Sequence, residues 1–121
     1  MKSVLIVDDN TEMRHLLRRL LQAQALQVSE AENGESALAM LRTNEYALMV
    51  TDIIMPGIEG IELIGEAKAA HPTMKIIAMS GALGSGRMNV LDLAQAFGAD
   101  AVLAKPFRPA AMLAEVQRLI G

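Results

Sequence analysis

The chain has 121 residues, of which 52 % are hydrophobic, and this length is typical of a single domain with a substantial core. Its 11 basic and 14 acidic residues give a formal net charge of −3 without a basic cluster, so direct binding of nucleic acid has little support. The sequence contains no cysteine, which excludes disulfides, thiolate nucleophiles and cysteine-ligated zinc.

The N-terminus shows no targeting or membrane segment. Lys2 and Ser3 lead into an apolar run at residues 4–7, which two acidic residues then end. A run of this length is too short for a signal peptide or a membrane span. We therefore expect a soluble, cytoplasmic protein that does not interact with membranes.

The first half of the chain alternates short apolar runs with helical patterns. Residues 4–7 predict a buried strand, and the apolar spacing over residues 11–24 predicts a helix with Asn10 as its N-cap. Residues 27–31 predict a second, weaker strand. Asn33 and the glycine after it lead into a second helix.

The same alternation continues to the end of the chain. The expected strands are residues 47–51, 75–80 and 101–104, and the expected helices are residues 61–70, 90–97 and 109–120. Strands that alternate with helices indicate right-handed βαβ units and a parallel sheet covered on both faces. Because no linker or low-complexity segment interrupts this pattern, we expect residues 1–121 to form a single domain without an output domain.

Charged residues stand where three of the predicted strands end. Asp8 and Asp9 follow the first strand, Asp52 the third, and Lys105 the fifth. The carboxyl ends of parallel strands share one edge of the sheet, where ligands of such folds bind. Three carboxylates that meet there repel one another unless a cation joins them, and one lysine is not enough. Divalent ions such as Mg²⁺ prefer carboxylate oxygens, so the pattern predicts a metal-dependent phosphate site.

These residue types suit phosphoryl transfer. Asp52 stands alone at its strand end and suits a nucleophile, whose attack on phosphorus gives an aspartyl phosphate. The side chains of Asp8 and Asp9 point in different directions, so one can bind a metal directly and the other through water. Ser80 ends the fourth strand and offers a hydroxyl donor, and Lys105 offers a compact positive charge. By contrast, Arg14, Arg18 and Arg19 are expected to form a solvated helix face.

Four stretches of the sequence resemble the receiver domains of two-component response regulators. They are VLIVDDN at Val4–Asn10, TDIIMPGIEGIEL at Thr51–Leu63, IIAMSG at Ile76–Gly81 and GADAVLAKPF at Gly98–Phe107. The resemblance covers the whole chain in order and suggests a stand-alone receiver. It implies an α/β, flavodoxin-like (βα)5 three-layer sandwich with a parallel five-stranded sheet of order 2-1-3-4-5.

The resemblance also implies roles at the site. Asp52 is expected to accept the phosphoryl group, Asp9 to bind Mg²⁺ directly, and Asp8 to act mainly through a water molecule. The backbone carbonyl of Ile54 is expected to complete the metal ligands of the protein. The resemblance also implies that Asp52 is one of the metal ligands.

Two further residues are expected to contact the phosphoryl group. The resemblance implies that Ser80 donates a hydrogen bond to it and that Lys105 pairs with it, with a cis peptide bond before Pro106. The donor is expected to be a phosphohistidine on a sensor histidine kinase or a histidine phosphotransfer protein, and water later hydrolyses the acyl phosphate. The protein is thus expected to be a phosphorylation-dependent switch or phosphate relay rather than a conventional enzyme.

The output is expected at one face of the domain, formed by the fourth helix, fifth strand and fifth helix, where a downstream protein target binds. Two features depart from the family pattern. Val102 stands where most receivers have Tyr or Phe, and the loop Gly81–Gly86 lies in a stretch about three residues longer than in common receivers. Val102 keeps open a second reading, a degenerate, phosphate-independent interaction module, and the long loop suggests altered partner choice or switching.

An enzyme is a third reading. Mg²⁺-dependent phosphatases of the haloacid dehalogenase family also use an aspartate nucleophile. They place it on the first strand in an Asp-x-Asp pattern, whereas here Asp8 and Asp9 are adjacent and the lone Asp52 follows the third strand. The phosphatase is therefore the less favoured alternative.

Overall fold

A computed structural model describes residues 2–53, 60–81 and 90–121 of the protein. Five parallel strands form one sheet in the order β2-β1-β3-β4-β5. They are β1 (Ser3–Val7), β2 (Gln27–Ala31), β3 (Leu48–Asp52), β4 (Lys75–Ser80) and β5 (Ala101–Ala104). The predicted strands and the predicted strand order are confirmed.

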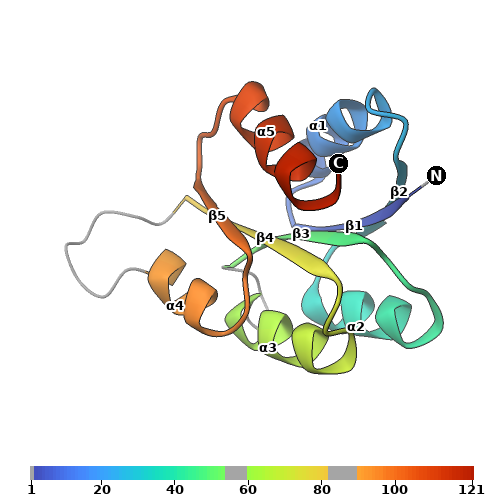
Figure 1. Cartoon of the computed structure of the whole chain (residues 1–121), viewed down its shortest axis with the longest axis vertical. Coiled ribbons are helices and arrows are strands. Elements are labelled where there is room, and N and C mark those ends of the chain that lie inside the picture. Colours follow the sequence, from blue (N-terminus) through green and yellow to red (C-terminus); the bar gives the residue numbers. More distant parts are fainter. Residues whose placement is uncertain (1, 54–59, 82–89) are drawn as a thin grey trace.

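Helices cover both faces of the sheet. Helices α1 (Thr11–Gln22) and α5 (Pro109–Ile120) lie together on one face, and α2 (Gly34–Thr43), α3 (Gly60–Ala70) and α4 (Val90–Ala96) lie on the other (Figure 1). The predicted three-layer α/β sandwich is confirmed. No helix in the described ranges is long and apolar enough to cross a membrane.

Side chains of β1 supply both halves of the core. Val4 and Ile6 pack in the cluster that includes side chains of α1 and α5, and Leu5 and Val7 pack in the cluster on the α2–α3 side. Successive side chains of a strand point to opposite faces of its sheet. A strand covered by helices on both faces is therefore apolar at every position, which is why a short continuous apolar run predicted this strand.

Short polar side chains begin the first two helices. Asn10 accepts a hydrogen bond from the Met13 N–H (2.9 Å), and Asn33 accepts one from the Ser36 N–H (2.8 Å). Helix α1 ends at Gln22, two residues before the predicted end. The chain turns there, and Ala25 takes a left-handed backbone conformation with φ of 62°.

Strand register brings the predicted site residues to one edge of the sheet. Asp52, the last residue of β3, lies opposite Met79 of β4, so Ser80 comes just beyond it. Ala104, the last residue of β5, lies opposite Ser80, and Lys105 follows at once.

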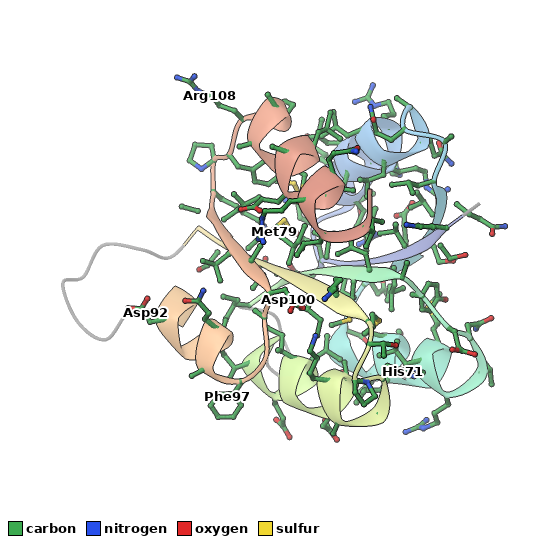
Figure 2. All side chains as sticks on the ribbon, in the orientation of Figure 1. His71, Met79, Asp92, Phe97, Asp100 and Arg108 are labelled. Atoms are coloured by element: carbon green, nitrogen blue, oxygen red, sulfur yellow. The ribbon has the colours of Figure 1, made fainter. Side chains whose placement is uncertain are left out.

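At the opposite edge of the sheet, where the strands begin, Asp100 links neighbouring elements. Its Oδ2 accepts hydrogen bonds from the Ile76 N–H (2.9 Å) and from Lys68 Nζ (2.8 Å), which joins α3 to the start of β4 and β5 (Figure 2). Phe97, just after α4, is half exposed and points away from the domain in the same view.

Candidate functional site

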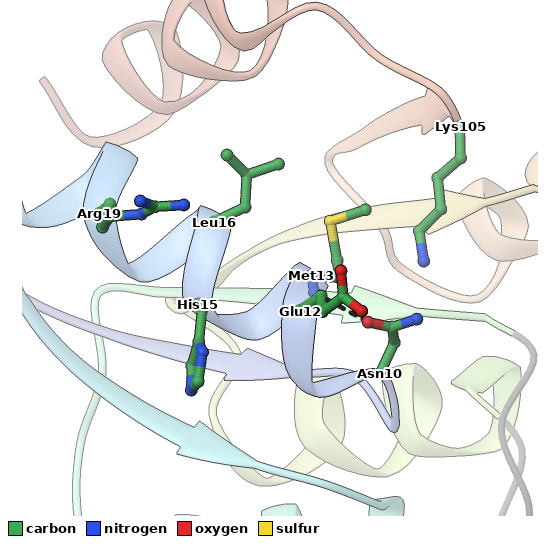
Figure 3. Close-up of a pocket in the computed structure, with 7 residues that line it drawn as sticks. All are labelled: Asn10, Glu12, Met13, His15, Leu16, Arg19 and Lys105. Atoms are coloured by element: carbon green, nitrogen blue, oxygen red, sulfur yellow. Dashed lines mark hydrogen bonds between the residues drawn. The ribbon is translucent and has the colours of Figure 1, made fainter.

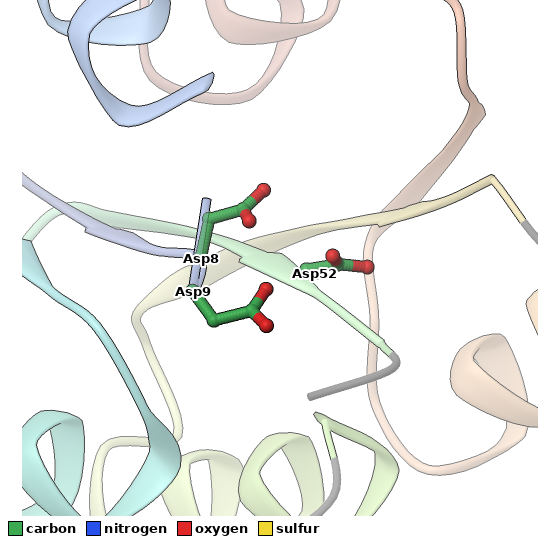
Figure 4. A group of neighbouring side chains, drawn as sticks. All are labelled: Asp8, Asp9 and Asp52. Carbon is green, nitrogen blue, oxygen red and sulfur yellow. The ribbon is translucent and has the colours of Figure 1, made fainter. Parts of the chain in front are cut away.

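The three aspartates predicted from strand ends do converge. Each of Asp8, Asp9 and Asp52 offers a carboxylate oxygen, and these oxygens all lie within 4.8 Å of one another (Figure 4). Asp8 is fully buried and Asp52 is 8 % exposed, whereas Asp9 is exposed. The arrangement offers hard oxygen donors with one side open to solvent, which suits a hydrated divalent cation.

Lys105 completes the predicted quartet. Its Nζ lies 2.9 Å from Asp8 Oδ2 and 3.1 Å from Asp52 Oδ2, so one ammonium group bridges two of the three carboxylates. The Lys105–Pro106 peptide bond is cis, as predicted. The lysine therefore supplies the positive charge that holds the two buried carboxylates together.

Burial and ion pairing have opposite effects on the pKa values of Asp8 and Lys105. Burial raises the pKa of the Asp8 carboxyl, and the pKa stays above its ordinary value although the Asn10 N–H and Lys105 act against the shift. Burial also acts to lower the pKa of Lys105, but the hydrogen bond and charge of Asp8 and the charge of Asp52 outweigh it and raise this pKa. The ammonium group of Lys105 thus stays protonated.

The chain around Asp8 is held by backbone hydrogen bonds. The Asp8 N–H donates to the Ala31 carbonyl (3.2 Å), and Asp8 Oδ1 accepts from the Asn10 N–H (2.9 Å). Since Lys105 donates to Oδ2, both oxygens of the Asp8 carboxylate have a partner. These hydrogen bonds fix the Asp8 carboxylate in place, and its indirect role at a metal stays a prediction.

The end of β3 packs against the start of α3. The Gly60 N–H donates to the Ile53 carbonyl (2.8 Å), and the Ile53 N–H donates to the Met79 carbonyl (2.9 Å). A Cβ atom on Gly60 would lie 2.5 Å from Ile53 Cα and 2.6 Å from Ile53 O, and closer still to Asp52 O. Only glycine lets α3 approach the backbone of Asp52 this closely.

Ser80 lies at the same edge. It is fully buried at the end of β4, and its carbonyl accepts a hydrogen bond from the Lys105 N–H (2.9 Å), which ties the ends of β4 and β5 together. Ile54, expected to offer a backbone carbonyl to the metal, lies outside the described residues. So does most of the predicted loop Gly81–Gly86.

An open groove of about 610 Å³ adjoins the quartet along α1 (Figure 3). Its lining residues are Asn10, Glu12, Met13, His15, Leu16, Arg19 and Lys105. Lys105 lines the groove and also bonds to Asp8 and Asp52, so the groove and the acidic cluster share this residue.

The prediction of a solvated arginine face is wrong for two of its three members. Arg14 and Arg18 both form ion pairs with Glu30 of β2, and the Arg14 side chain is only 13 % exposed. Arg19 is exposed, as expected. Helical spacing places Arg14 and Arg18 on one face, but nothing local in the sequence shows that β2 brings a carboxylate to that face.

Comparison with known proteins agrees with the geometry. The sequence model of the response regulator receiver domain matches residues 4–117. The chain is 31 % identical over 121 residues to the response regulator receiver protein CpdR of Brucella abortus, covering 99 % of this chain and 98 % of that protein.

Longer proteins and solved structures are similar as well. The chain is 36 % identical to the transcriptional regulatory protein CpxR of Klebsiella pneumoniae, covering 99 % of this chain but only 50 % of CpxR. The chain thus spans about half the length of that regulator. The structure of TrrA from Thermotoga maritima, in complex with Mg²⁺-BeF, superposes with a TM-score of 0.86 at 35 % identity, covering 99 % of this chain and 100 % of TrrA.

Proposed function

The chain belongs to the response regulator receiver domains of two-component signalling, and on that premise we propose that Asp52 is its phospho-accepting residue. The observation that carries this proposal is the convergence of Asp8, Asp9 and Asp52 with the ammonium group of Lys105. No comparable grouping of acidic side chains occurs elsewhere in residues 2–53, 60–81 and 90–121.

The metal of this site is proposed to be Mg²⁺. Asp9, which is exposed, binds it directly, and Asp52 supplies a second oxygen. Asp8 acts through a bound water, and the backbone carbonyl of Ile54 is the remaining protein ligand of the proposal. When bound, Mg²⁺ neutralises the negative charge that gathers on the phosphoryl oxygens. The fit rests on the oxygen-only donor set and on its solvent-exposed side.

The chemistry proposed for Asp52 is a simple displacement. A carboxylate oxygen of Asp52 attacks phosphorus of a phosphohistidine, an O–P bond forms as the N–P bond breaks, and the leaving imidazole nitrogen takes a proton from solvent. Lys105 exchanges its contact with Asp52 for a phosphoryl oxygen, and the Ser80 hydroxyl donates to another. Water later hydrolyses the acyl phosphate, which restores the Asp52 carboxylate.

Partners follow from this chemistry. The donor is a sensor histidine kinase or a histidine phosphotransfer protein, and the groove along α1 beside Lys105 gives its phosphohistidine a path to Asp52. A downstream protein target binds the face of α4, β5 and α5. The conformation of this face changes when the phosphoryl dianion attracts Ser80 and Lys105. The protein acts in this way as a phosphorylation-dependent switch or relay.

Intact-mass measurement tests the proposal. We expect one labile phosphoryl adduct after incubation with Mg²⁺ and acetyl phosphate, and no adduct in Asp52→Asn or in the presence of a chelator. Asp92→Asn is the matched control, because Asp92 is an exposed aspartate on α4. This variant should be phosphorylated to the same extent as the protein of the native sequence. A phosphoryl adduct that persists in Asp52→Asn would disprove the assignment, and its absence from the unmodified protein would favour the phosphate-independent module.

A further inference from the structure

Arg14 ties the corner between β1 and α1 to the neighbouring strand. Its Nη1 donates to the backbone carbonyl of Asp8 (2.7 Å), its Nε donates to Glu30 Oε1 (3.0 Å), and its Nη2 donates to Thr11 Oγ1 (3.3 Å). One planar guanidinium thus joins the end of β1, the first turn of α1 and a strand residue of β2. The Arg14 side chain is 13 % exposed, so it is largely but not fully buried.

Glu30 is a firm anchor for Arg14. Burial acts to raise the pKa of Glu30, but the hydrogen bonds and charges of Arg18 and Arg14 outweigh it and hold the pKa below its ordinary value. Glu30 therefore stays ionised at neutral pH. It lies opposite Ile6 in the parallel β1–β2 pair, next to the strand end that carries the aspartates.

The Asp8 carbonyl belongs to the peptide plane that joins Asp8 to Asp9. Rotation of this plane would shift the Asp9 carboxylate relative to that of Asp8, which the Asn10 N–H and Lys105 hold in place. The backbone N–H of Asp8 bonds to Ala31, but its carbonyl is at the strand end, where Arg14 is the side chain that fixes it. We propose that Arg14 is a positioning residue, which orients the Asp8–Asp9 peptide so that the Asp9 carboxylate meets those of Asp8 and Asp52 at the metal. This inference rests on the proposed metal-dependent function.

Two explanations of the role of Arg14 predict opposite changes in Mg²⁺ affinity when the residue is replaced. If Arg14 acted only through its positive charge, its removal would lower the repulsion felt by a cation and strengthen Mg²⁺ binding. If Arg14 orients the peptide, its removal weakens Mg²⁺ binding because the Asp9 carboxylate is no longer held toward the other two. The sign of the change in the dissociation constant therefore separates the two.

Arg18 provides the matched control. It has the same charge, lies one helical turn away and pairs with the same Glu30, whereas the hydrogen bond to the Asp8 carbonyl comes from Arg14. Arg14→Lys is the second variant. It keeps the charge at position 14 but lacks the planar fork that holds the Asp8 carbonyl and Glu30 together.

The experiment measures Mg²⁺ affinity by titration calorimetry and the rate of phosphorylation by acetyl phosphate at limiting and saturating Mg²⁺. For Arg14→Gln we expect the dissociation constant to rise about 10-fold, with a smaller rise for Arg14→Lys and a change of less than about 2-fold for Arg18→Gln. Saturating Mg²⁺ should restore most of the phosphorylation rate in Arg14→Gln.

The outcomes are distinct. An unchanged or lower dissociation constant in both Arg14 variants overturns the positioning role, and so does an equal loss in Arg18→Gln. Thermal unfolding in chelator shows whether Arg14→Gln is folded, and if it is not, Arg14→Lys decides the question. Failure of the unmodified protein to bind Mg²⁺ or to be phosphorylated would instead count against the proposed function.

Discussion

Lys105 takes the place of a metal cation at the site. Its Nζ is within hydrogen-bond distance of both Asp8 and Asp52, so its charge offsets part of the repulsion that a bound metal would otherwise offset. Two cations that balance the same carboxylates compete. We therefore expect lysine at this position to stabilise the metal-free protein and to weaken metal binding.

Replacement of this lysine tests the competition. We expect Lys105→Met to bind Mg²⁺ about 10-fold more tightly, equivalent to roughly 1.4 kcal/mol, because the carboxylates lose their internal cation. Titration calorimetry measures the change. Lys68→Met is the control, since Lys68 forms a comparable ion pair with Asp100 (2.8 Å) at the opposite edge of the sheet and should leave Mg²⁺ affinity unchanged. Weaker binding in Lys105→Met would show that the lysine helps to organise the metal ligands instead.

Asp8 makes stability depend on pH. Its pKa in the folded protein is above the ordinary value, chiefly because of burial, so its favourable contribution is complete below the ordinary carboxyl pKa and is lost as the pH rises through the folded pKa. Above this folded pKa, the Asp8 carboxylate is a buried charge that reduces the stability of the metal-free protein.

The Asp8→Asn variant measures this effect. We expect the variant to be more stable than the unmodified protein by about 1 kcal/mol at neutral pH without metal, as is common when a charge kept for function is removed. The difference should shrink as the pH falls through the raised pKa of Asp8, because the unmodified side chain then becomes neutral as well. Urea unfolding at neutral and acidic pH provides the comparison, and a difference that does not change with pH would rule out ionisation as the cause.

The sequence predicted the acidic cluster and Lys105 but not the role of Arg14. Strand ends can be located from apolar runs, and parallel strands place those ends at one edge, so charges at strand ends can be brought together by topology alone. Arg14 depends instead on which side of α1 faces β2 and on where Glu30 lies. Both follow from packing between α1 and β2, which brings together two residues that are 16 positions apart in the sequence.

At the scale of elements, the junction of β3 and α3 controls the position of Asp52. Gly60 begins α3, and its missing side chain lets the helix contact the Asp52 and Ile53 backbone. Gly65 lies in the interior of the same helix, and a Cβ atom there would meet only Phe97 Cδ2 at 3.5 Å, an ordinary contact. The two glycines therefore differ in what an added methyl group would do.

We expect Gly60→Ala to destabilise the protein by about 2 kcal/mol, since the methyl group would overlap rigid backbone atoms. Gly65→Ala should instead be neutral or stabilising by up to about 1 kcal/mol, because alanine is the better helix former. Chemical unfolding of both variants gives the two free energies. Equal effects would mean that helix propensity rather than backbone contact explains the glycine at position 60.

The end of α1 and the position of Val102 differ in how far the sequence could predict them. The predicted strands are confirmed because their apolar runs are continuous, but α1 ends before the predicted Gln24, since Ala25 adopts a positive φ that alanine rarely takes. Val102 lies opposite Ala78 in the sheet and packs against the core on the α2–α3 side. A valine at this place has no ring to turn, so readout by ring rotation is not available to this residue.

At the scale of the whole molecule, the buried charge is concentrated at one edge and the core is aliphatic. The buried polar or charged residues of the described ranges are Asp8, Thr51, Asp52 and Ser80. All four lie at the carboxyl ends of β1, β3 and β4 or directly after them. The rest of the sheet can therefore stabilise a site that is electrostatically unfavourable without metal. That residues 1–121 act as a single receiver without an output domain stays a prediction.

This arrangement predicts that metal reverses the order of stability between two proteins. Without metal, Asp8→Asn should unfold at the higher temperature, because it lacks the buried charge. With Mg²⁺ at 100 times the dissociation constant of the unmodified protein, binding adds about 2.7 kcal/mol to that protein, or roughly 10 °C in unfolding temperature. Asp8→Asn has lost one of the acids and gains less.

Thermal unfolding with and without Mg²⁺ decides the matter. The unmodified protein should become the more stable of the two when Mg²⁺ is present, and Asp92→Asn, whose aspartate is exposed on α4, should follow the unmodified protein under both conditions. If Asp8→Asn stays the more stable protein at every Mg²⁺ concentration, Asp8 contributes nothing to metal binding and its buried charge needs another explanation. If the order reverses, the cost of burying Asp8 is offset by the cation that the three aspartates hold together.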